Sequence, residues 1–170
     1  SVEGIGLCAL HVVASAETFR EALAPVTIGA DKWIDLYRYS SAAACASALR
    51  AAGMIQCALV PEAEATIDDL PVNAPVALWA GNERAGLSDE AIAACDTSAR
   101  LAMHGFSQSF NLSVSVALAT YRIAARRREA IGAEGDLATA ERARLRARWY
   151  ALGVKNPRPI LARFVSNSTR

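Results

Sequence analysis

Histidine is scarce in this 170-residue chain, which has two, and its four cysteines do not stand at metal-binding spacings. Without a CxxC pair, and with only His11 and His104 as imidazoles, a zinc site is not expected. The cysteines are therefore predicted to be small core residues of a reduced, cytoplasmic protein, and no secretory signal opens the sequence. They are Cys8, Cys45, Cys57 and Cys95.

Three signatures of nucleotide and nucleophile sites are also missing. The P-loop pattern GxxxxGK[ST] does not occur, and GNERAG (81–86) lacks the GxGxxG spacing of dinucleotide-binding folds. GFSQS (105–109) has serine where the nucleophile-elbow pattern ends in glycine, and no histidine follows it. P-loop, dinucleotide-binding and triad-hydrolase functions are therefore disfavoured.

A long, purely apolar run is absent as well. Residues 101–121, LAMHGFSQSFNLSVSVALATY, contain no charged residue, but Gln108, Asn111 and several serines interrupt them. A membrane-spanning helix needs about 20 predominantly apolar residues, so no membrane span is expected here. At 53% hydrophobic residues, the chain is instead expected to fold as one domain with a substantial core.

Charge is unevenly distributed along the chain. Residues 1–121 hold 6 basic and 13 acidic residues, whereas residues 122–170 hold 12 basic and 4 acidic ones, so their net charges are −7 and +8. A basic tail on an acidic body is expected of a protein that binds a polyanion such as RNA. A pair of solvated, arginine-rich helices fits equally well, and charge alone leaves both interpretations open.

Short strands alternating with helices predict an α/β domain with a mostly parallel sheet. The interval 62–75, with Pro71 and Pro75, is expected to be a surface connection. Residues 112–121 should begin a buried helix that continues to about Ile131. Strands are predicted at 8–13, 32–39, 55–60, 76–80 and 98–103, and further helices at 16–24, 41–52, 88 onward and 136–152.

Two uncharged or weakly charged turns follow the strands at 76–80 and 98–103. Ligands in open α/β sheets bind beyond the carboxyl ends of strands, so these turns are predicted to hold a small molecule. Gly81, Gly86 and Gly105 would let the backbone approach it closely. The Glu83 carboxylate is expected to accept backbone N–H groups in its turn, and Asn111 to cap the following helix.

The same segments carry a family resemblance. GNERAGLS (81–88) and LAMHGFSQSFNLSVSVA (101–117) resemble the second and third motifs of SPOUT-class RNA methyltransferases of the TrmH type. With GADKWIDL (29–36) and LRAAGMIQCALVPE (49–62), the resemblance extends from Ser1 to about Trp149. It implies a trefoil-knotted α/β fold with a mostly parallel sheet flanked by helices. Residues 1–131 would form this domain, and 132–170 a basic helical C-terminal extension.

The resemblance also implies a cofactor and a set of site residues. S-adenosyl-L-methionine would bind in a bent form inside the knot, in a homodimer whose site lies near the subunit contact. Glu83, Ser109 and Asn111 match the polar motif residues and are the expected catalytic set. The first motif's Asn and catalytic Arg would precede Ser1 and are absent from this sequence. The residues expected around the cofactor are Leu59, Gly81, Leu101, Met103 and Phe110.

The function that this resemblance implies is 2′-O-methylation of a tRNA ribose, with the D-loop guanosine, guanosine-18, as the favoured target. The same chemistry on rRNA or at another tRNA position is the nearest alternative. A non-catalytic RNA-binding dimer that keeps the knot is the alternative from another class.

Overall fold

The computed structural model describes residues 1–15, 33–106, 109–154 and 159. Contacts divide the chain into two compact units, residues 1–135 and residues 136–170. The predicted boundary between a domain of residues 1–131 and an extension of residues 132–170 stays a prediction. The helix expected at 16–24 lies outside the described residues.

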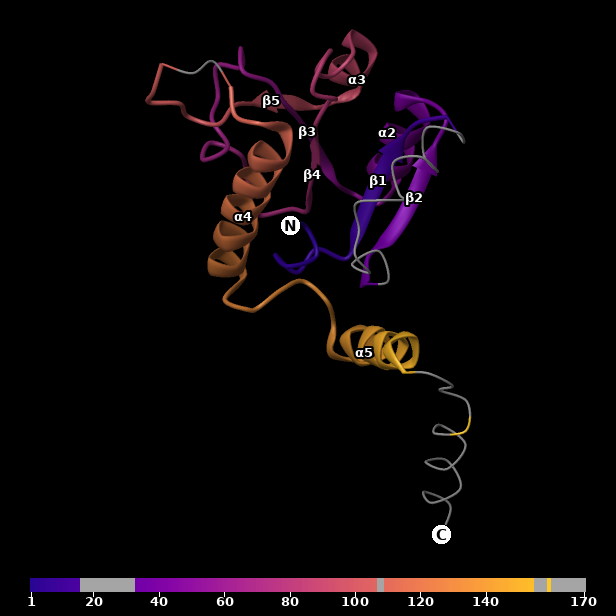
Figure 1. Cartoon of the computed structure of the whole chain (residues 1–170). Helices are drawn as coiled ribbons and strands as arrows, with labels where there is room; N and C mark the ends of the chain where they lie inside the picture. Colours follow the sequence, from indigo (N-terminus) through magenta and orange to yellow (C-terminus); the bar gives the residue numbers. More distant parts are fainter. Residues whose placement is uncertain (16–32, 107–108, 155–158, 160–170) are drawn as a thin grey trace. The chain divides into compact units, whose positions relative to one another are not determined.

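All strand pairs in the first unit are parallel, which confirms the α/β expectation (Figure 1). β1 (Ala9–Val13) pairs with β2 (Asp35–Tyr39), and β3 (Ile55–Leu59) lies between β4 (Val76–Trp79) and β5 (Thr97–Ala99). The strands thus form a two-stranded and a three-stranded sheet instead of the single sheet expected. α2 (Ala42–Ala51) contacts strands of both sheets.

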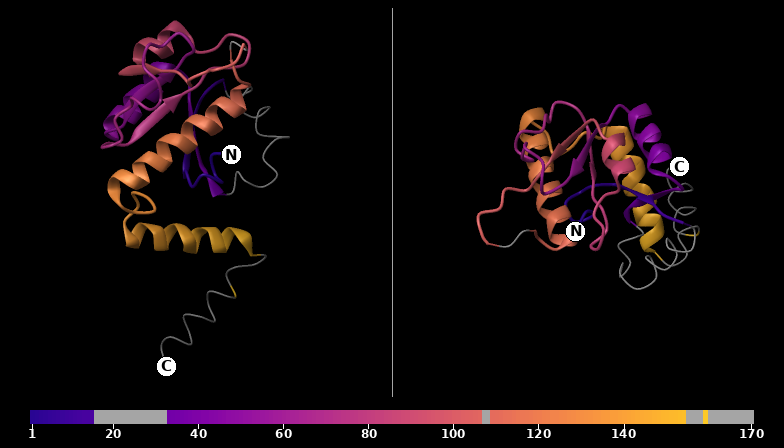
Figure 2. Two further views of the ribbon diagram at one scale, coloured as in Figure 1. Left: turned by 90° about the vertical axis from the view of Figure 1, so that its left-hand side faces the viewer. Right: turned by 90° about the horizontal axis from the view of Figure 1, so that it is seen from above.

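Helices cover both faces of the three-stranded sheet (Figures 1 and 2). Successive side chains of β3 point to opposite faces, so neighbouring residues of β3 pack against different helices. Cys57 packs with Ala119 of α4 (Leu112–Ile131) on one face. On the other face, Gln56 Nε2 donates to the Ala46 carbonyl of α2 at 3.1 Å. α3 (Asp89–Ala94) packs on this second face through Ala91.

Capping residues mark the helix ends. Ser41 Oγ accepts from Ala44 N at 3.2 Å at the start of α2, and Ser88 Oγ accepts from Ala91 N at 3.2 Å at the start of α3. Gly132 ends α4 in the left-handed conformation, with φ 62°. The last helix, α5 (Thr139–Gly153), begins three residues later than expected.

Three segments differ from the prediction because contacts distant in sequence decide them. The strand expected at 32–39 begins only at Asp35. The strand expected at 98–103 ends at Ala99, since Arg100 bridges to Thr66 instead. The interval 62–75 is not a mere surface connection, because Ile67 and Leu70 belong to the core at 6% and 3% exposure.

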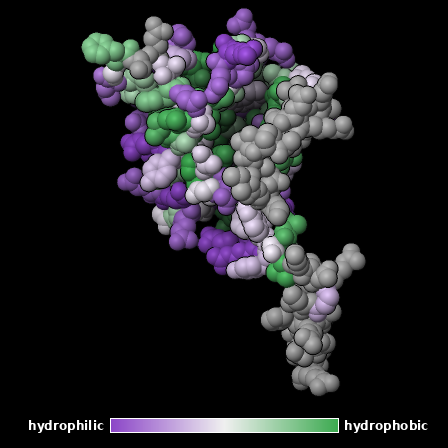
Figure 3. Space-filling view, viewed as in Figure 1, coloured by the Kyte–Doolittle hydropathy of each residue, from purple (hydrophilic) through white to green (hydrophobic). Residues whose placement is uncertain are grey.

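α4 is buried on one side only, so the prediction of a buried helix is wrong for its other side. Ala119 and Thr120 are buried, whereas Val114, Leu118 and Tyr121 are exposed. Apolar surface lies over the N-terminal half of α4, and hydrophilic surface over its C-terminal half (Figure 3). Within the described residues, no helix combines the length and apolar character needed to cross a membrane.

The four cysteines are free thiols, as expected, but they are not all core residues. Cys45 and Cys57 are buried, and burial raises the pKa of the Cys57 thiol to about 11. Cys8 and Cys95 are partly exposed, which corrects the expectation for these two. The pKa of Cys95 is nevertheless raised to about 12, chiefly by desolvation, so its thiolate is a minor species at neutral pH.

The arginines of α4 bond to other segments of the first unit. Arg126 donates to the carbonyl oxygens of Ile67 and Leu70 at 2.8 and 3.0 Å. These bonds fix the interval 62–75 against α4. The other contacts are Arg122 Nε to Asp68 Oδ1, Arg127 Nη1 to Val72 O and Arg128 Nη2 to Ile5 O, each at 2.6 Å.

Arg126→Ala is expected to lower the free energy of unfolding by about 2 kcal/mol, because two partly buried carbonyl groups lose charged donors. Arg122→Ala is the matched control. Its ion pair with Asp68 is more than half exposed on both sides, so its loss should change stability by less than about 1 kcal/mol. Urea unfolding followed by circular dichroism measures both. Equal losses of unfolding free energy in the two variants would contradict the conclusion that Arg126 stabilises the first unit more than Arg122 does.

Candidate active site at the strand ends

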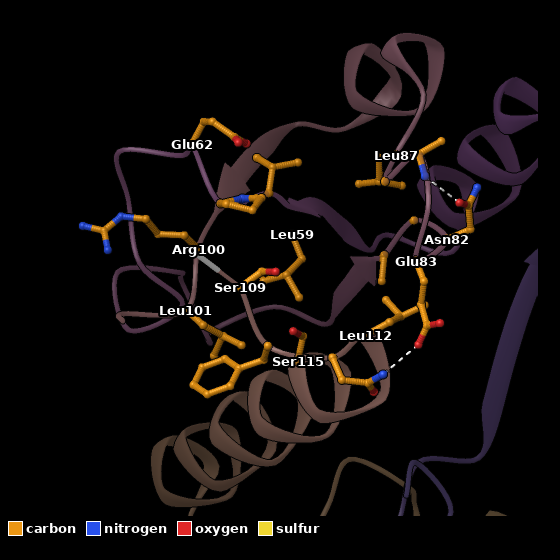
Figure 4. A pocket seen from close by; sticks show the side chains of 18 of the residues that line it. Leu59, Glu62, Asn82, Glu83, Leu87, Arg100, Leu101, Ser109, Leu112 and Ser115 are labelled. Atoms are coloured by element: carbon orange, nitrogen blue, oxygen red, sulfur yellow. Dashed lines mark hydrogen bonds between the residues drawn. The ribbon is translucent and has the colours of Figure 1, made fainter. Parts of the chain in front are cut away.

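A cavity of about 830 Å³ lies beyond the carboxyl ends of β3, β4 and β5 (Figure 4). This is the end of a parallel sheet at which ligands bind, and the volume is in the range of small-molecule sites. The structure brings all eight residues of the expected catalytic and cofactor-binding sets to this one cavity, whereas Gly105, also expected near the ligand, is not among the residues that line it. The eight are Leu59, Gly81, Glu83, Leu101, Met103, Ser109, Phe110 and Asn111.

The turn after β4 is closed tightly around Gly81. Asn82 and Gly86 exchange two backbone hydrogen bonds, of 3.2 and 3.0 Å. The Asn82 side chain accepts from the backbone N–H groups of Arg84 and Ala85 at 3.0 and 2.8 Å. A Cβ on Gly81 would overlap the backbone of Gly86, so this position requires glycine.

Glu83 links the two motif turns instead of bonding within its own turn. Its Oε1 accepts a hydrogen bond from Asn111 Nδ2 at 2.7 Å, drawn as a dashed line in Figure 4. The expected acceptance of backbone N–H groups is performed by Asn82, one residue earlier. The residue that accepts these N–H groups is therefore Asn82, one position before the predicted Glu83. A short Asn side chain reaches the amides two residues further along more readily than a Glu side chain does.

Asn111 also begins α4, as predicted. Its Oδ1 accepts from Ser113 N at 2.9 Å and from Ser113 Oγ at 2.6 Å. One amide group therefore caps the helix with its oxygen and holds Glu83 with its nitrogen. The position of α4 at the cavity and the position of the 81–86 turn are set by the same side chain.

The cavity wall combines apolar and polar groups. Leu59, Leu101 and Phe110 supply apolar surface from three different segments. Glu62 and Arg100 lie on one side of the cavity and Glu83 on the opposite side (Figure 4). The wall suits a ligand with a flat apolar part, hydrogen-bonding groups and a charged end.

Several lining residues were not predicted. Asn82 could have been found from its place in a glycine-framed turn directly after a strand. Glu62 and Arg100 follow the ends of β3 and β5, but a single charged residue at such a place is a weak signal. Ser115 lies one turn inside α4, and only the helix geometry brings it to the cavity.

Comparison with known proteins identifies the family. A model of the SpoU rRNA Methylase family matches residues 1–121. A tRNA (guanosine(18)-2′-O)-methyltransferase of Borreliella burgdorferi is 33% identical over 157 residues, which are 91% of this chain and 70% of that protein.

Solved structures give the same fold. The TrmH/SpoU tRNA modifying enzyme of A. aeolicus superposes with a TM-score of 0.73 at 22% identity, covering 91% of this chain and 80% of that one. The SpoU methyltransferase AviRb from Streptomyces viridochromogenes, in complex with AdoMet, has a TM-score of 0.57 at 22% identity. That match covers 75% of this chain and 53% of AviRb.

The matched segment contains both glycine-framed turns and all eight predicted residues of the cavity. The parallel strands and flanking helices agree with the TrmH/SpoU structure, while the knot stays a prediction. The chain belongs to the SpoU rRNA methylase family, the TrmH type of SPOUT-class RNA methyltransferases.

Proposed function

We propose that this protein transfers a methyl group from S-adenosyl-L-methionine to the 2′-hydroxyl of a tRNA ribose, at guanosine-18. The observation that carries the proposal is the joining of both motif turns in one cavity by the Glu83–Asn111 hydrogen bond. The B. burgdorferi relative supports the target, since that protein is a tRNA (guanosine(18)-2′-O)-methyltransferase.

The cavity fits S-adenosyl-L-methionine in chemistry and size. Gly81 brings backbone into the wall where no side chain has room, which leaves amide and carbonyl groups to bind a ligand. Leu59, Leu101 and Phe110 offer an apolar surface for adenine, and the carboxylates of Glu62 and Glu83 favour a positively charged sulfonium. AviRb, which shares the fold, has been solved with AdoMet.

The residues of the chain act by binding and orientation. When bound, S-adenosyl-L-methionine would supply an electrophilic methyl group that a nucleophile takes up, with S-adenosyl-L-homocysteine as the leaving group. Asn111 and Glu83 fix the two turns against each other, and Ser109 offers a hydroxyl at the cavity. Holding a ribose hydroxyl in line with the methyl group accounts for a large part of such a rate enhancement, because orientation removes an entropic cost.

A methyl-transfer assay with tritiated S-adenosyl-L-methionine tests the function. The expected result is one methyl group per tRNA transcript, mapped to the 2′-oxygen of guanosine-18, and none on a transcript with 2′-deoxyguanosine there. Cofactor binding without transfer to any RNA would favour the non-catalytic RNA-binding dimer.

Ribosomal RNA is the second candidate substrate, because the matched family model describes rRNA methylases. The same assay includes rRNA fragments beside tRNA. Preferential methylation of rRNA would replace tRNA as the substrate but leave the chemistry of the cavity unchanged. A tRNA substrate would place the protein in the cytoplasm.

A second copy of this chain is proposed to cover the exposed stripe of α4. Val114, Leu118 and Tyr121 recur at helical spacing within α4, and Phe110 lies just before the helix. Phe110, Val114, Leu118 and Tyr121 are 40%, 43%, 44% and 64% exposed. A contiguous apolar stripe of this kind favours association. Because Phe110 also lines the cavity, this contact would bring the partner subunit to the active site.

Leu118→Asp is expected to convert the homodimer into a monomer without unfolding it, since Leu118 is exposed in the single chain. Light scattering measures the mass and circular dichroism the helix content. Ala130→Asp is the control: it places the same charge on an exposed position of α4 outside the stripe and should leave the dimer intact. A wild-type monomer, or a dimer in Leu118→Asp, would contradict the proposed interface.

A further inference from the structure

Two side chains stand beside the cavity without forming part of its wall. Arg84 directly follows Glu83, which lines the cavity, but is not itself a lining residue. Phe106 lies in the loop that begins at Met103 and ends at Ser109, and both of these residues line the cavity. Each of the two motif turns therefore presents one large side chain at the rim, a cation on the first turn and an aromatic ring on the second.

The guanidinium of Arg84 is exposed on a turn whose backbone is held in place. The Arg84 N–H donates to Asn82 Oδ1 at 3.0 Å, and the preceding residue, Glu83, is held by Asn111 Nδ2 at 2.7 Å. The side chain is exposed, and no described residue gives it a hydrogen-bond or ion-pair partner. A fixed backbone with an uncommitted guanidinium suits a phosphate, which arginine binds through parallel hydrogen bonds.

Phe106 is 110% exposed, so its ring lies in solvent. Its neighbours His104 and Gly105 are exposed as well and add no large apolar side chain beside it. The connection between β5 and α4, to which these residues belong, extends outward from the sheet (Figure 1). A partner protein usually covers a contiguous apolar patch, whereas a single ring among small and polar neighbours is typical of a platform on which a nucleobase stacks.

The substrate of the proposed reaction has a geometry that matches this rim. In a nucleotide, C2′ lies between C1′, which carries the base, and C3′, whose oxygen carries the next phosphate. When the 2′-hydroxyl enters the cavity, the base and this phosphate must therefore lie at its mouth. The carboxylates of Glu62 and Glu83 in the wall would repel the phosphate, and a cation beside them offsets this repulsion.

We propose that the rim holds the target nucleotide, with its 3′-phosphate on Arg84 and its base stacked on Phe106. The inference rests on the proposed function, because it names the residues that position the ribose for methyl transfer. The Glu83–Asn111 hydrogen bond joins the two turns, so it also sets the spacing of the phosphate contact and the base contact. Stacking accepts any base, so Phe106 holds the base without selecting guanine.

Three substitutions of Phe106 distinguish stacking from a simple apolar contact. Phe106→Ala and Phe106→Leu are both expected to raise the KM for tRNA about tenfold with kcat nearly unchanged, because leucine fills space but has no π-face. Phe106→Tyr keeps the ring and should stay within about twofold of the wild type. A leucine variant that behaves like the wild type, or a dimer that Phe106→Ala converts into a monomer in light scattering, would overturn stacking in favour of a contact with a second copy.

A tRNA that lacks only the target base tests the stack on the substrate side. Assembled from synthetic pieces, it keeps the ribose and its 2′-hydroxyl, and binding is measured by fluorescence anisotropy. The wild type should bind this RNA about tenfold more weakly than intact tRNA, and Phe106→Ala should then cost less than about twofold more, because the stack is already lost. The same loss for Phe106→Ala on both RNAs would contradict the contact.

Arg84→Gln tests the phosphate contact. It is expected to raise the KM for tRNA about tenfold and to lower the slope of log affinity against log salt by about 0.7, for one lost contact to a single-stranded phosphate. Arg38→Gln, on β2, is the control: it removes an equal charge from an exposed position outside the cavity and should change affinity less than about twofold.

An uncharged methylphosphonate in place of the target 3′-phosphate identifies the atom group that Arg84 binds. On this RNA, the wild type and Arg84→Gln should bind within about twofold of each other, because the charge that Arg84 contacts is absent. A tenfold difference that persists on the methylphosphonate, or equal effects of Arg84→Gln and Arg38→Gln on intact tRNA, would overturn the assignment.

Calorimetry with S-adenosyl-L-methionine separates this inference from the proposed function. All of these variants should bind the cofactor like the wild type, because neither Arg84 nor Phe106 lines the cavity. Methylation by the wild type with an unchanged KM in Arg84→Gln and Phe106→Ala would refute the rim contacts and leave the proposed function in place. A wild type that binds the cofactor but neither binds nor methylates RNA would refute both.

Discussion

Gly81→Ala is expected to abolish methyl transfer and to lower the free energy of unfolding by about 3 kcal/mol, the upper range of overpacking. The added methyl group would overlap the backbone of Gly86 and the nitrogen of Leu87, neither of which is a flexible side-chain end. The 81–86 turn must therefore open, which displaces Glu83 from Asn111. Urea unfolding and the methyl-transfer assay measure the two effects.

Gly105→Ala is the matched control for this substitution. Gly105 lies in the other motif turn, and a Cβ there meets no atom within 4 Å. Its effect on stability should stay within about 0.5 kcal/mol, and cofactor binding should be retained. If Gly105→Ala were as damaging as Gly81→Ala, the effect would come from glycine flexibility in general and not from close contact at Gly81.

Asn111→Asp is expected to lower kcat/KM about 100-fold. Without the hydrogen bond from Asn111 to Glu83 the two turns can shift, and a small shift misaligns the groups for in-line transfer. Asp keeps an oxygen that can cap α4 through Ser113 N, so the helix start should survive. The donor to Glu83 is replaced by a carboxylate, and two negative charges then face each other at hydrogen-bond distance.

The double variant Glu83→Gln with Asn111→Asp decides whether that link is the cause. It re-creates the hydrogen bond with donor and acceptor exchanged, and about a tenfold recovery over Asn111→Asp is expected. Ser113→Ala removes the neighbouring hydroxyl bond only and should leave kcat/KM within about threefold. No recovery in the double variant would mean that Asn111 acts in some way other than holding Glu83.

Local signals in the sequence predicted much of the fold and the two turns at the cavity. Ser41, Ser88 and Asn111 mark helix starts, and Gly132 marks a helix end, because capping depends on neighbours a few residues away. The place of the two turns could be predicted because strands of a parallel sheet bring their carboxyl ends to one edge. The family resemblance supplied the set of site residues and their roles, and the roles stay proposals.

Contacts between distant residues were not predictable in this way. Nothing local indicates that Ile67 is buried, because its burial depends on packing with Ala119, 52 positions later. The arginines of α4 look like a solvated basic run in sequence, yet Arg126 bonds to carbonyls 59 and 56 positions earlier. The same holds for Glu83, whose partner lies 28 positions away.

Titration calorimetry with S-adenosyl-L-methionine is the most direct test of the central claim that the two motif turns form one cofactor site. The wild type and Gly105→Ala are expected to bind one molecule per chain, whereas Gly81→Ala should give no heat of binding. No heat with the wild type, or the same affinity in Gly81→Ala, would contradict this account of the cavity.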